Sequence, residues 1–142
     1  MGRVMTRDTD ATIRSDVSSA ELLAAVTQFL KERAVPALTG RDQFNARVAA
    51  NVLGIIDREQ AIAPKLAELD DAAAAKWLPT DSSPSHTAVD IARALANRKI
   101  TIDDDFIQYL KARQLLVTAI NNPRYPSRSI AEERWRGTLV DD

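Results

Sequence analysis

The chain has 142 residues, of which 45% are apolar and 27% charged, values typical of one globular domain. Its formal net charge of −1 lacks the positive excess of nucleic-acid-binding proteins, and the absence of cysteine excludes disulfides, thiol nucleophiles and thiolate metal sites. A single histidine, His86, excludes sites that need two imidazoles, and 23 alanines against four glycines favour helix over sheet.

Residues 1–17 show no sustained helical period, so we expect a flexible N-terminal arm. No signal peptide or membrane-spanning run is recognisable, which makes a cytoplasmic location the expectation. Ser18 and Glu21 have the spacing of a capping box, and the apolar residues that follow recur every three or four positions. This pattern predicts a first helix from Ser18 that bends or ends near Val35, because Pro36 lacks an N–H group.

A second helix is predicted over residues 41–61, after Gly40 closes the preceding segment in a left-handed conformation. Pro64 stops this helix or kinks it into a third segment over residues 65–77. The apolar residues of the second helix recur on one side and form the clearest helical pattern in the chain: Phe44, Val48, Val52, Ile55, Ile56 and Ile62.

The proline- and serine-rich residues 78–85 predict an exposed loop, and a fourth helix is predicted over residues 87–98. A fifth helix is predicted from Asp103, an N-cap followed by two further acidic residues, to Asn121. A short helix over residues 130–136 completes the pattern.

These elements predict an all-α protein, an irregular bundle of about five main helices with a short C-terminal helix added. We expect a helical domain over residues 18–126, preceded by the arm of residues 1–17 and followed by a tail over residues 127–142. The first, second and fifth helices carry the strongest apolar stripes, so we expect them to form the core.

The sequence contains no recognisable motif for catalysis, cofactor binding or metal binding. Its four glycines form no phosphate loop, and neither HExxH, GxSxG nor an EF-hand ladder occurs. The acidic run Asp103–Asp105 is explained by its position at a helix start. We therefore expect no catalytic residue, no cofactor and no metal, and a protein that is not an enzyme.

Four polar residues lie on or beside the apolar face of the second helix, and a fifth lies among the apolar residues of the fifth helix. They are Arg47, Asn51, Arg58 and Glu59 on the second helix and Arg113 on the fifth. One interpretation is an ion-pair network in which Glu59 neutralises the arginines, because an unpaired buried charge is costly. The other is a pocket for an anionic ligand such as an acyl-CoA or a phosphorylated metabolite.

The C-terminal segment combines arginines with aromatic residues, among them Tyr125, Arg128 and Trp135. Such a combination can bind nucleic acid, but neighbouring acidic residues cancel much of the charge, so nucleic-acid binding is not expected. We expect instead either a solvated tail or an interaction tail that docks on a partner protein, and Trp135 can pack on the body of the domain. A homodimer is favoured, because a domain poor in aromatics can hide an apolar helix face in self-association.

Two motif blocks carry a family resemblance, and the first is the more specific: Gly40-Arg41, Phe44, Arg47-Val48-Ala49 and Asn51, and the closing Asn122-Pro123-Arg124-Tyr125. Further matching residues are Ala20-Glu21-Leu22-Leu23, Ala25-Val26, Phe29-Leu30, Pro36-Ala37-Leu38 and Arg58-Glu59. Over residues 18–126 the chain resembles an uncharacterised bacterial family of all-helical domains of unknown function, often encoded beside aminoglycoside-phosphotransferase-like kinases and acyl-CoA dehydrogenases. The resemblance implies an accessory or interaction role as a partner of such an enzyme, with no catalytic residues to carry over. Binding of an anionic small molecule is the alternative function.

Overall fold

The computed structural model describes residues 17–79 and 87–136. In chain order these form α1 (Ser19–Phe29), the π-helical turn η1 (Leu30–Ala34), α2 (Val35–Ala37), α3 (Gly40–Trp77), α4 (Thr87–Ala96), α5 (Asp104–Asn121) and α6 (Pro126–Arg134). The all-α prediction is confirmed, because the described residues contain no strand and include the expected short C-terminal helix. No helix in these ranges is both long and apolar enough to cross a membrane. The expectations for the N-terminal arm, for most of the loop over residues 78–85, and for the end of the tail lie outside the described residues.

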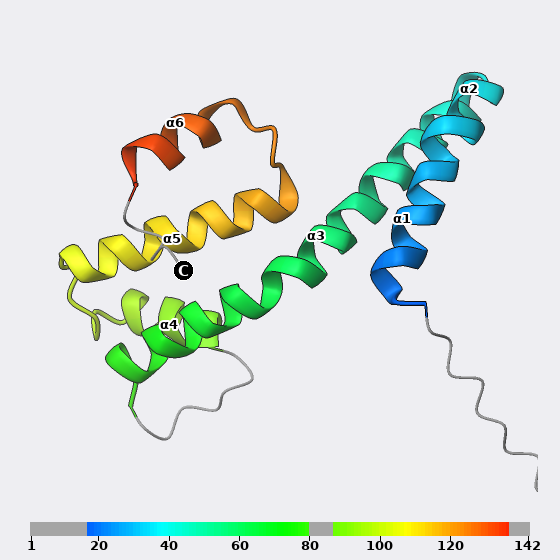
Figure 1. Cartoon of the computed structure of the whole chain (residues 1–142). Coiled ribbons are helices and arrows are strands. Elements are labelled where there is room, and N and C mark those ends of the chain that lie inside the picture. The colour runs from blue at the N-terminus through cyan, green and yellow to red at the C-terminus, as the bar shows by residue number, and fades with distance from the viewer. Residues whose placement is uncertain (1–16, 80–86, 137–142) are drawn as a thin grey trace, which may run out of the picture.

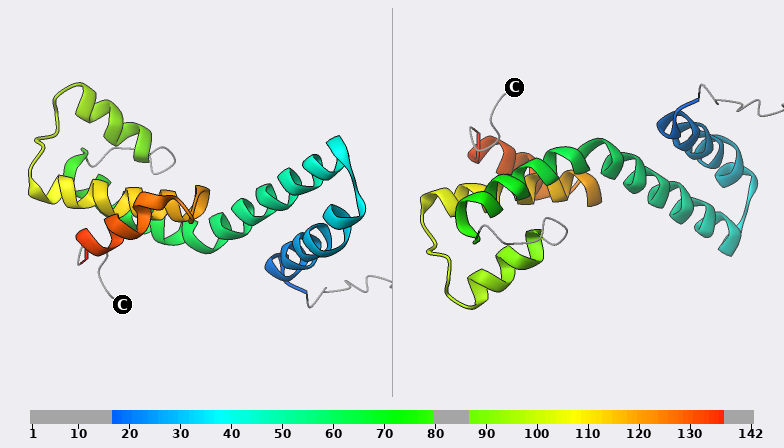
Figure 2. Two further views of the ribbon diagram at one scale, coloured as in Figure 1. Left: turned by 90° about the horizontal axis from the view of Figure 1, so that it is seen from above. Right: turned by 90° about the horizontal axis from the view of Figure 1, so that it is seen from below.

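The long helix α3 connects two groups of helices (Figure 1). α1 packs along the first half of α3. We call α1, η1, α2 and residues 40–60 the N-terminal hairpin. The second half of α3, from residue 61, forms with α4, α5 and α6 what we call the C-terminal lobe. Figure 2 shows that α1 and the α4–α6 group lie toward opposite ends of α3, so the molecule is elongated.

The N-terminal hairpin begins with the predicted capping box. The hydroxyl of Ser18 accepts a hydrogen bond from the backbone N–H of Glu21 at 3.2 Å, and the Ser18 N–H donates to the Glu21 carboxylate at 2.8 Å. The Ser18 hydroxyl also donates to this carboxylate at 2.8 Å, and the two hydrogen bonds that the carboxylate accepts, the one from the backbone N–H first, lower the pKa of Glu21. At the turn into α3, Gly40 has a φ of 57°, a left-handed conformation that glycine adopts without steric cost.

Two prolines lie inside helical segments, and neither acts as a simple stop. The helix widens before Pro36 into η1, where the Val35 N–H donates to a carbonyl five residues back. Pro64 lies within α3, which continues to Trp77. The prediction that Pro64 could stop the second helix is therefore wrong. Packing of the second half of α3 against α4 and α5 outweighs the lost backbone hydrogen bond.

The hydrophobic core lies in the C-terminal lobe. Its buried residues come from α3, α4, α5 and the segment between the last two: Ala73, Ile91, Ile100, Phe106 and Tyr109. Trp77 packs edge-on against Phe106, with ring centroids 5.2 Å apart. Asp103 is the N-cap of α5, as predicted, and its carboxylate accepts from the Phe106 N–H at 2.9 Å.

The N-terminal hairpin is held together differently, and this corrects the expected core. No residue of α1 is buried, and the buried residues of α3 in the hairpin are the small Ala46 and Ala50. Because two paired helices share only one face, larger apolar residues remain partly in solvent: Leu22, Val26, Phe29, Phe44, Val48, Val52 and Ile56. The prediction that the first, second and fifth helices form the core fails for the first helix and for the first half of α3.

Candidate anion-binding cavity

A cavity of about 560 Å³ lies where the N-terminal hairpin meets the turn between α5 and α6. Three segments line it: the end of the first helical stretch, the middle of α3, and the residues around the α5–α6 turn. The lining residues are Lys31, Val35, Arg47, Ala50, Asn51, Gly54, Arg58, Asn121, Asn122, Pro123 and Arg124. Arg47, Asn51, Gly54 and Arg58 are three or four residues apart, which places them along one side of α3.

The cavity lining is strongly basic. It carries the cationic side chains of Lys31, Arg47, Arg58 and Arg124, and no carboxylate of residues 17–79 or 87–136. Among the described residues, none of the four forms an ion pair. Like charges gathered at a concave surface repel one another and attract an anion together.

Arg58 is held in place by the end of α5. Its Nε donates to the backbone carbonyl of Ile120 at 2.8 Å, which satisfies a carbonyl that the helix end leaves without an internal partner. A Cβ at Gly54 would lie 3.2 Å from Nη1 of Arg58, so the glycine leaves room for the guanidinium against α3. Arg58 thus joins the hairpin to the lobe while lining the cavity.

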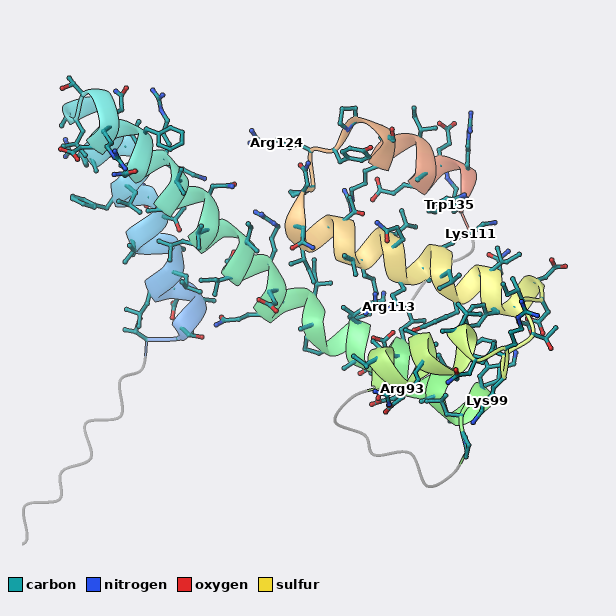
Figure 3. All side chains as sticks on the ribbon, turned by 180° about the vertical axis from the view of Figure 1, so that it is seen from behind. Arg93, Lys99, Lys111, Arg113, Arg124 and Trp135 are labelled. Carbon is teal, nitrogen blue, oxygen red and sulfur yellow. The ribbon has the colours of Figure 1, made fainter. Side chains whose placement is uncertain are left out.

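Arg124 reaches the cavity because α5 ends just before it. Asn122 is the C-cap of α5, as the Asn-Pro pair predicts, and its carbonyl accepts from the Tyr125 N–H at 3.0 Å. In Figure 3 the Arg124 side chain extends from this turn toward the side of the molecule that holds the first half of α3.

A neighbouring cavity of about 390 Å³ between α1 and α3 shares Lys31 and Arg58 with the first. It is also lined by the carboxylates of Glu32 and Asp57. The shared cations therefore face acidic groups on one side, and the uncompensated positive charge is concentrated near Arg47 and Arg124.

The model of a domain of unknown function, DUF6285, matches residues 36–125. The chain belongs to the DUF6285 family. The match agrees with the resemblance, inferred from the sequence, to a family of domains of unknown function. No curated protein and no solved structure matches the chain. The two motif blocks of the resemblance both lie within the DUF6285 region and meet in the cavity, to which the first contributes Arg47 and Asn51 and the second Asn122, Pro123 and Arg124.

Of the five polar residues singled out from the sequence, the DUF6285 fold brings three into this cavity, Arg47, Asn51 and Arg58. Glu59 lies outside it, is exposed, and forms no ion pair within the described ranges. The ion-pair network centred on Glu59 is therefore a wrong prediction. Its physical reason is that Glu59 lies on the side of α3 that faces away from α1.

Arg113 has another partner in the C-terminal lobe. Its Nε lies 3.0 Å from Oδ1 of Asp70, which also accepts a hydrogen bond from the Tyr109 hydroxyl at 2.8 Å. Burial first, and then the hydrogen bond and charge of Asp70, raise the pKa of Tyr109. Sequence reasoning missed Asp70, although its spacing from Leu66 and Ala73 places it on the same side of the helix as these apolar residues.

The candidate interaction tail of this DUF6285 protein folds back along α5 as α6. Arg128 forms an ion pair with Glu132 of the same helix at 2.6 Å. Trp135 is partly buried, and the ammonium group of Lys111 lies 5.9 Å from its ring centroid. Both residues are labelled in Figure 3. Tyr125 is 52% exposed at the start of α6. Contact with a partner protein stays a prediction for this segment.

Proposed function

We propose that this DUF6285 protein binds a phosphate-bearing small anion in the basic cavity. The observation that carries the proposal is the lining, in which four cations and three amides surround one concave site without a carboxylate. Guanidinium groups pair with phosphate oxygens through two parallel hydrogen bonds, and a lysine adds a mobile ammonium group. A multiply charged phosphate would neutralise side chains that otherwise repel one another.

The size and polarity of the cavity narrow the class of ligand. A volume of about 560 Å³ suits a small metabolite. The apolar contribution to the lining is confined to Val35, Ala50 and Pro123, together with Gly54, which offers no side chain. An acyl chain has little apolar surface to pack against here, whereas the phosphates of a phosphorylated metabolite, or of coenzyme A itself, match the charge. The lining therefore favours a phosphorylated metabolite over the acyl part of an acyl-CoA.

Isothermal titration calorimetry of the purified chain tests this proposal, with tripolyphosphate, coenzyme A and citrate as probes. We expect tripolyphosphate to bind, and to bind more weakly as salt is added, because exposed charges are screened. Arg47→Ala should weaken binding by about ten-fold or more, the value of one charge-assisted contact. The double variant Arg47→Ala/Arg124→Ala should bind too weakly to measure.

Arg33→Ala is the matched control, because Arg33 is an exposed cation of η1 that does not line the cavity. It should leave the affinity unchanged, and circular dichroism should show the same helix content in every variant. The absence of binding by all three probes would contradict the proposal. So would equal weakening by Arg33→Ala, since that indicates attraction to overall charge and not to the cavity.

A second candidate is an accessory role as the partner of a phosphotransferase-like kinase or an acyl-CoA dehydrogenase, which the resemblance implies. The observation in its favour is an apolar stripe on α1, where Leu22, Val26 and Phe29 are 50–59% exposed. Co-purification from the native host with one of these enzymes is expected, with loss in Val26→Asp. Gln28→Asp adds the same charge on another side of α1 and should keep the complex. Recovery of neither enzyme with the unaltered chain would contradict this role.

A further inference from the structure

The side of α3 that faces away from α1 carries an uncovered apolar stripe. Four residues, which we call the outer stripe, are 63%, 44%, 46% and 36% exposed in the order Phe44, Val48, Val52 and Ile56. Successive members are four residues apart, a step that advances only about 40° around a helix. Phe44, Val48 and Val52 thus lie across the helix from Ala46 and Ala50, which are buried where α3 meets the first helical stretch, and Ile56 lies at the edge of the stripe.

Opposite charges lie at the two ends of the outer stripe. Arg41 precedes Phe44 by three residues, and Glu59 follows Ile56 by three. The two charged residues are 18 positions apart. This separation is about five helical turns, or roughly 27 Å, and puts both on the outer side of α3. Both are exposed, and neither forms an ion pair within the described part of the chain.

The pattern from Arg41 to Glu59 reads the same in both directions. Its spacings are three, four, four, four and three residues, with residue 50 at the centre. A second copy that packs antiparallel about a twofold axis at this point places Arg41 of each copy opposite Glu59 of the other. A surface with this symmetry is complementary to itself, which is the requirement for a closed dimer.

We propose that the outer stripe is the interface of an antiparallel homodimer of this chain. In this register Phe44 faces Ile56 of the second copy, and Val48 faces Val52. Two apolar contacts on each side of the axis are then bounded by an ion pair at each end. The charged ends specify the register, because sliding one helix past the other would separate both pairs.

The size of the surface predicts the strength of the dimer. The exposed parts of the four apolar side chains, with the stems of the two charged ones, amount to roughly 500 Å² per copy, below the ~800 Å² of a standard interface. We therefore expect a reversible dimer with a dissociation constant in the micromolar range. Arg47 and Arg58 of the cavity follow another side of α3, so dimerisation and anion binding are tested independently.

Sedimentation equilibrium over a range of concentrations tests the dimer. Arg41→Glu and Glu59→Arg each place like charges opposite one another at both ends, and each should weaken association by about ten-fold. The double variant Arg41→Glu/Glu59→Arg should restore it. Both positions are exposed, so circular dichroism and the melting temperature of the monomer should remain unchanged.

Mixing the two single variants provides a further check, because every facing pair in the mixed dimer is then of opposite charge. The mixture should associate more strongly than either variant alone, and Val48→Asp should abolish association. A chain that stays monomeric at about 1 mM would overturn the proposal, since that excludes even a weak specific complex. A dimer whose association is unchanged in both charge-reversal variants would overturn it too, and would indicate the apolar stripe on α1 as the interface.

Discussion

The two halves of the molecule bury their aromatic side chains to different extents, as Phe106 and Phe44 show. Phe106 in the C-terminal lobe is fully buried, whereas Phe44 in the N-terminal hairpin is 63% exposed. In the lobe, α4 and α5 both pack on α3 and enclose the residues between them. In the hairpin, the first helical stretch covers one side of α3, and the apolar residues on the opposite side, such as Phe44, stay in solvent.

The arginines follow the same division. Arg113 in the lobe forms an ion pair with Asp70, whose side chain is 12% exposed. Arg47 and Arg124, at the boundary between hairpin and lobe, line a cavity to which the described part of the chain contributes no carboxylate. The lobe therefore buries or pairs these side chains, while the hairpin and its boundary leave apolar and cationic groups exposed to solvent.

The largest effect should come from Phe106. Phe106→Ala removes a buried ring that contacts Trp77, and we expect it to lower the free energy of unfolding by about 3–5 kcal/mol. Phe44→Ala should cost less than about 1 kcal/mol, because its ring is mostly in solvent. Urea denaturation at low protein concentration, where the proposed dimer is dissociated, measures both. Equal losses would contradict the difference between the two halves.

Asp70→Ala should be the next most damaging change, because it leaves Arg113 and Tyr109 without their shared acceptor. We expect a loss of about 2–4 kcal/mol, less than for a fully buried pair, since the Arg113 side chain is 32% exposed. Glu68→Ala removes an exposed carboxylate two residues earlier in α3 and serves as the control. A comparable loss for Glu68→Ala would show that the Asp70 cluster has no special role.

The raised pKa of Tyr109 predicts an alkaline signature of the same cluster. The hydrogen-bonded Tyr109 hydroxyl contributes its full stabilisation below the ordinary pKa of tyrosine. This stabilisation is lost as the pH rises through the higher pKa of the folded state, because the unfolded chain releases the hydroxyl proton at a lower pH. The contribution of Tyr109 to the free energy of unfolding should decline by up to about 1.4 kcal/mol per pH unit above about pH 10. Tyr109→Phe should remove this slope in denaturation measured at several pH values. Tyr125→Phe, at an exposed position, should keep it, and a slope that survives in Tyr109→Phe would refute the assignment.

The smallest effect should come from the cap of the hairpin. Ser18→Ala should cost about 0.5–1 kcal/mol and increase amide hydrogen exchange at the start of α1, with little change in the lobe. Because the pKa of Glu21 is lowered, its contribution is present above the usual glutamate pKa and lost as the pH falls through the lowered one. The difference between the variant and the unaltered chain should therefore shrink in acid. A difference that persists at low pH would mean that the carboxylate takes no part in the cap.

Local structure was predictable because it depends on residues within a few positions of one another. The capping pair of Ser18 and Glu21, the left-handed Gly40, the Asp103 cap and the end of α5 at Asn122 all lie where the sequence indicates. Pro64 is the exception, because the packing that carries α3 past it comes from α4 and α5, which are distant in sequence.

The candidate cavity was predictable only in part. The side of α3 that bears Arg47, Asn51 and Arg58 could be derived from helical spacing, and so could their separation from Glu59 in angle. The spacing could not say which of these residues face another element, because amphipathicity does not specify how many neighbours a helix has. Lys31 and Arg124 were not predicted as cavity residues. The chain reversal between η1 and α3 brings Lys31 to the cavity, and the end of α5 brings Arg124 there.

By itself, the sequence determined that this chain is helical, where most of its helices begin and end, and which residues share a helix face. These properties follow from backbone hydrogen bonding and from a period of 3.6 residues, both of which are local. Only the tertiary structure decided that one apolar stripe of α3 is left uncovered, that Asp70 is the partner of Arg113, and that two distant motifs line one basic cavity. Those outcomes depend on which elements pack together, and that is decided by the free energy of the whole fold.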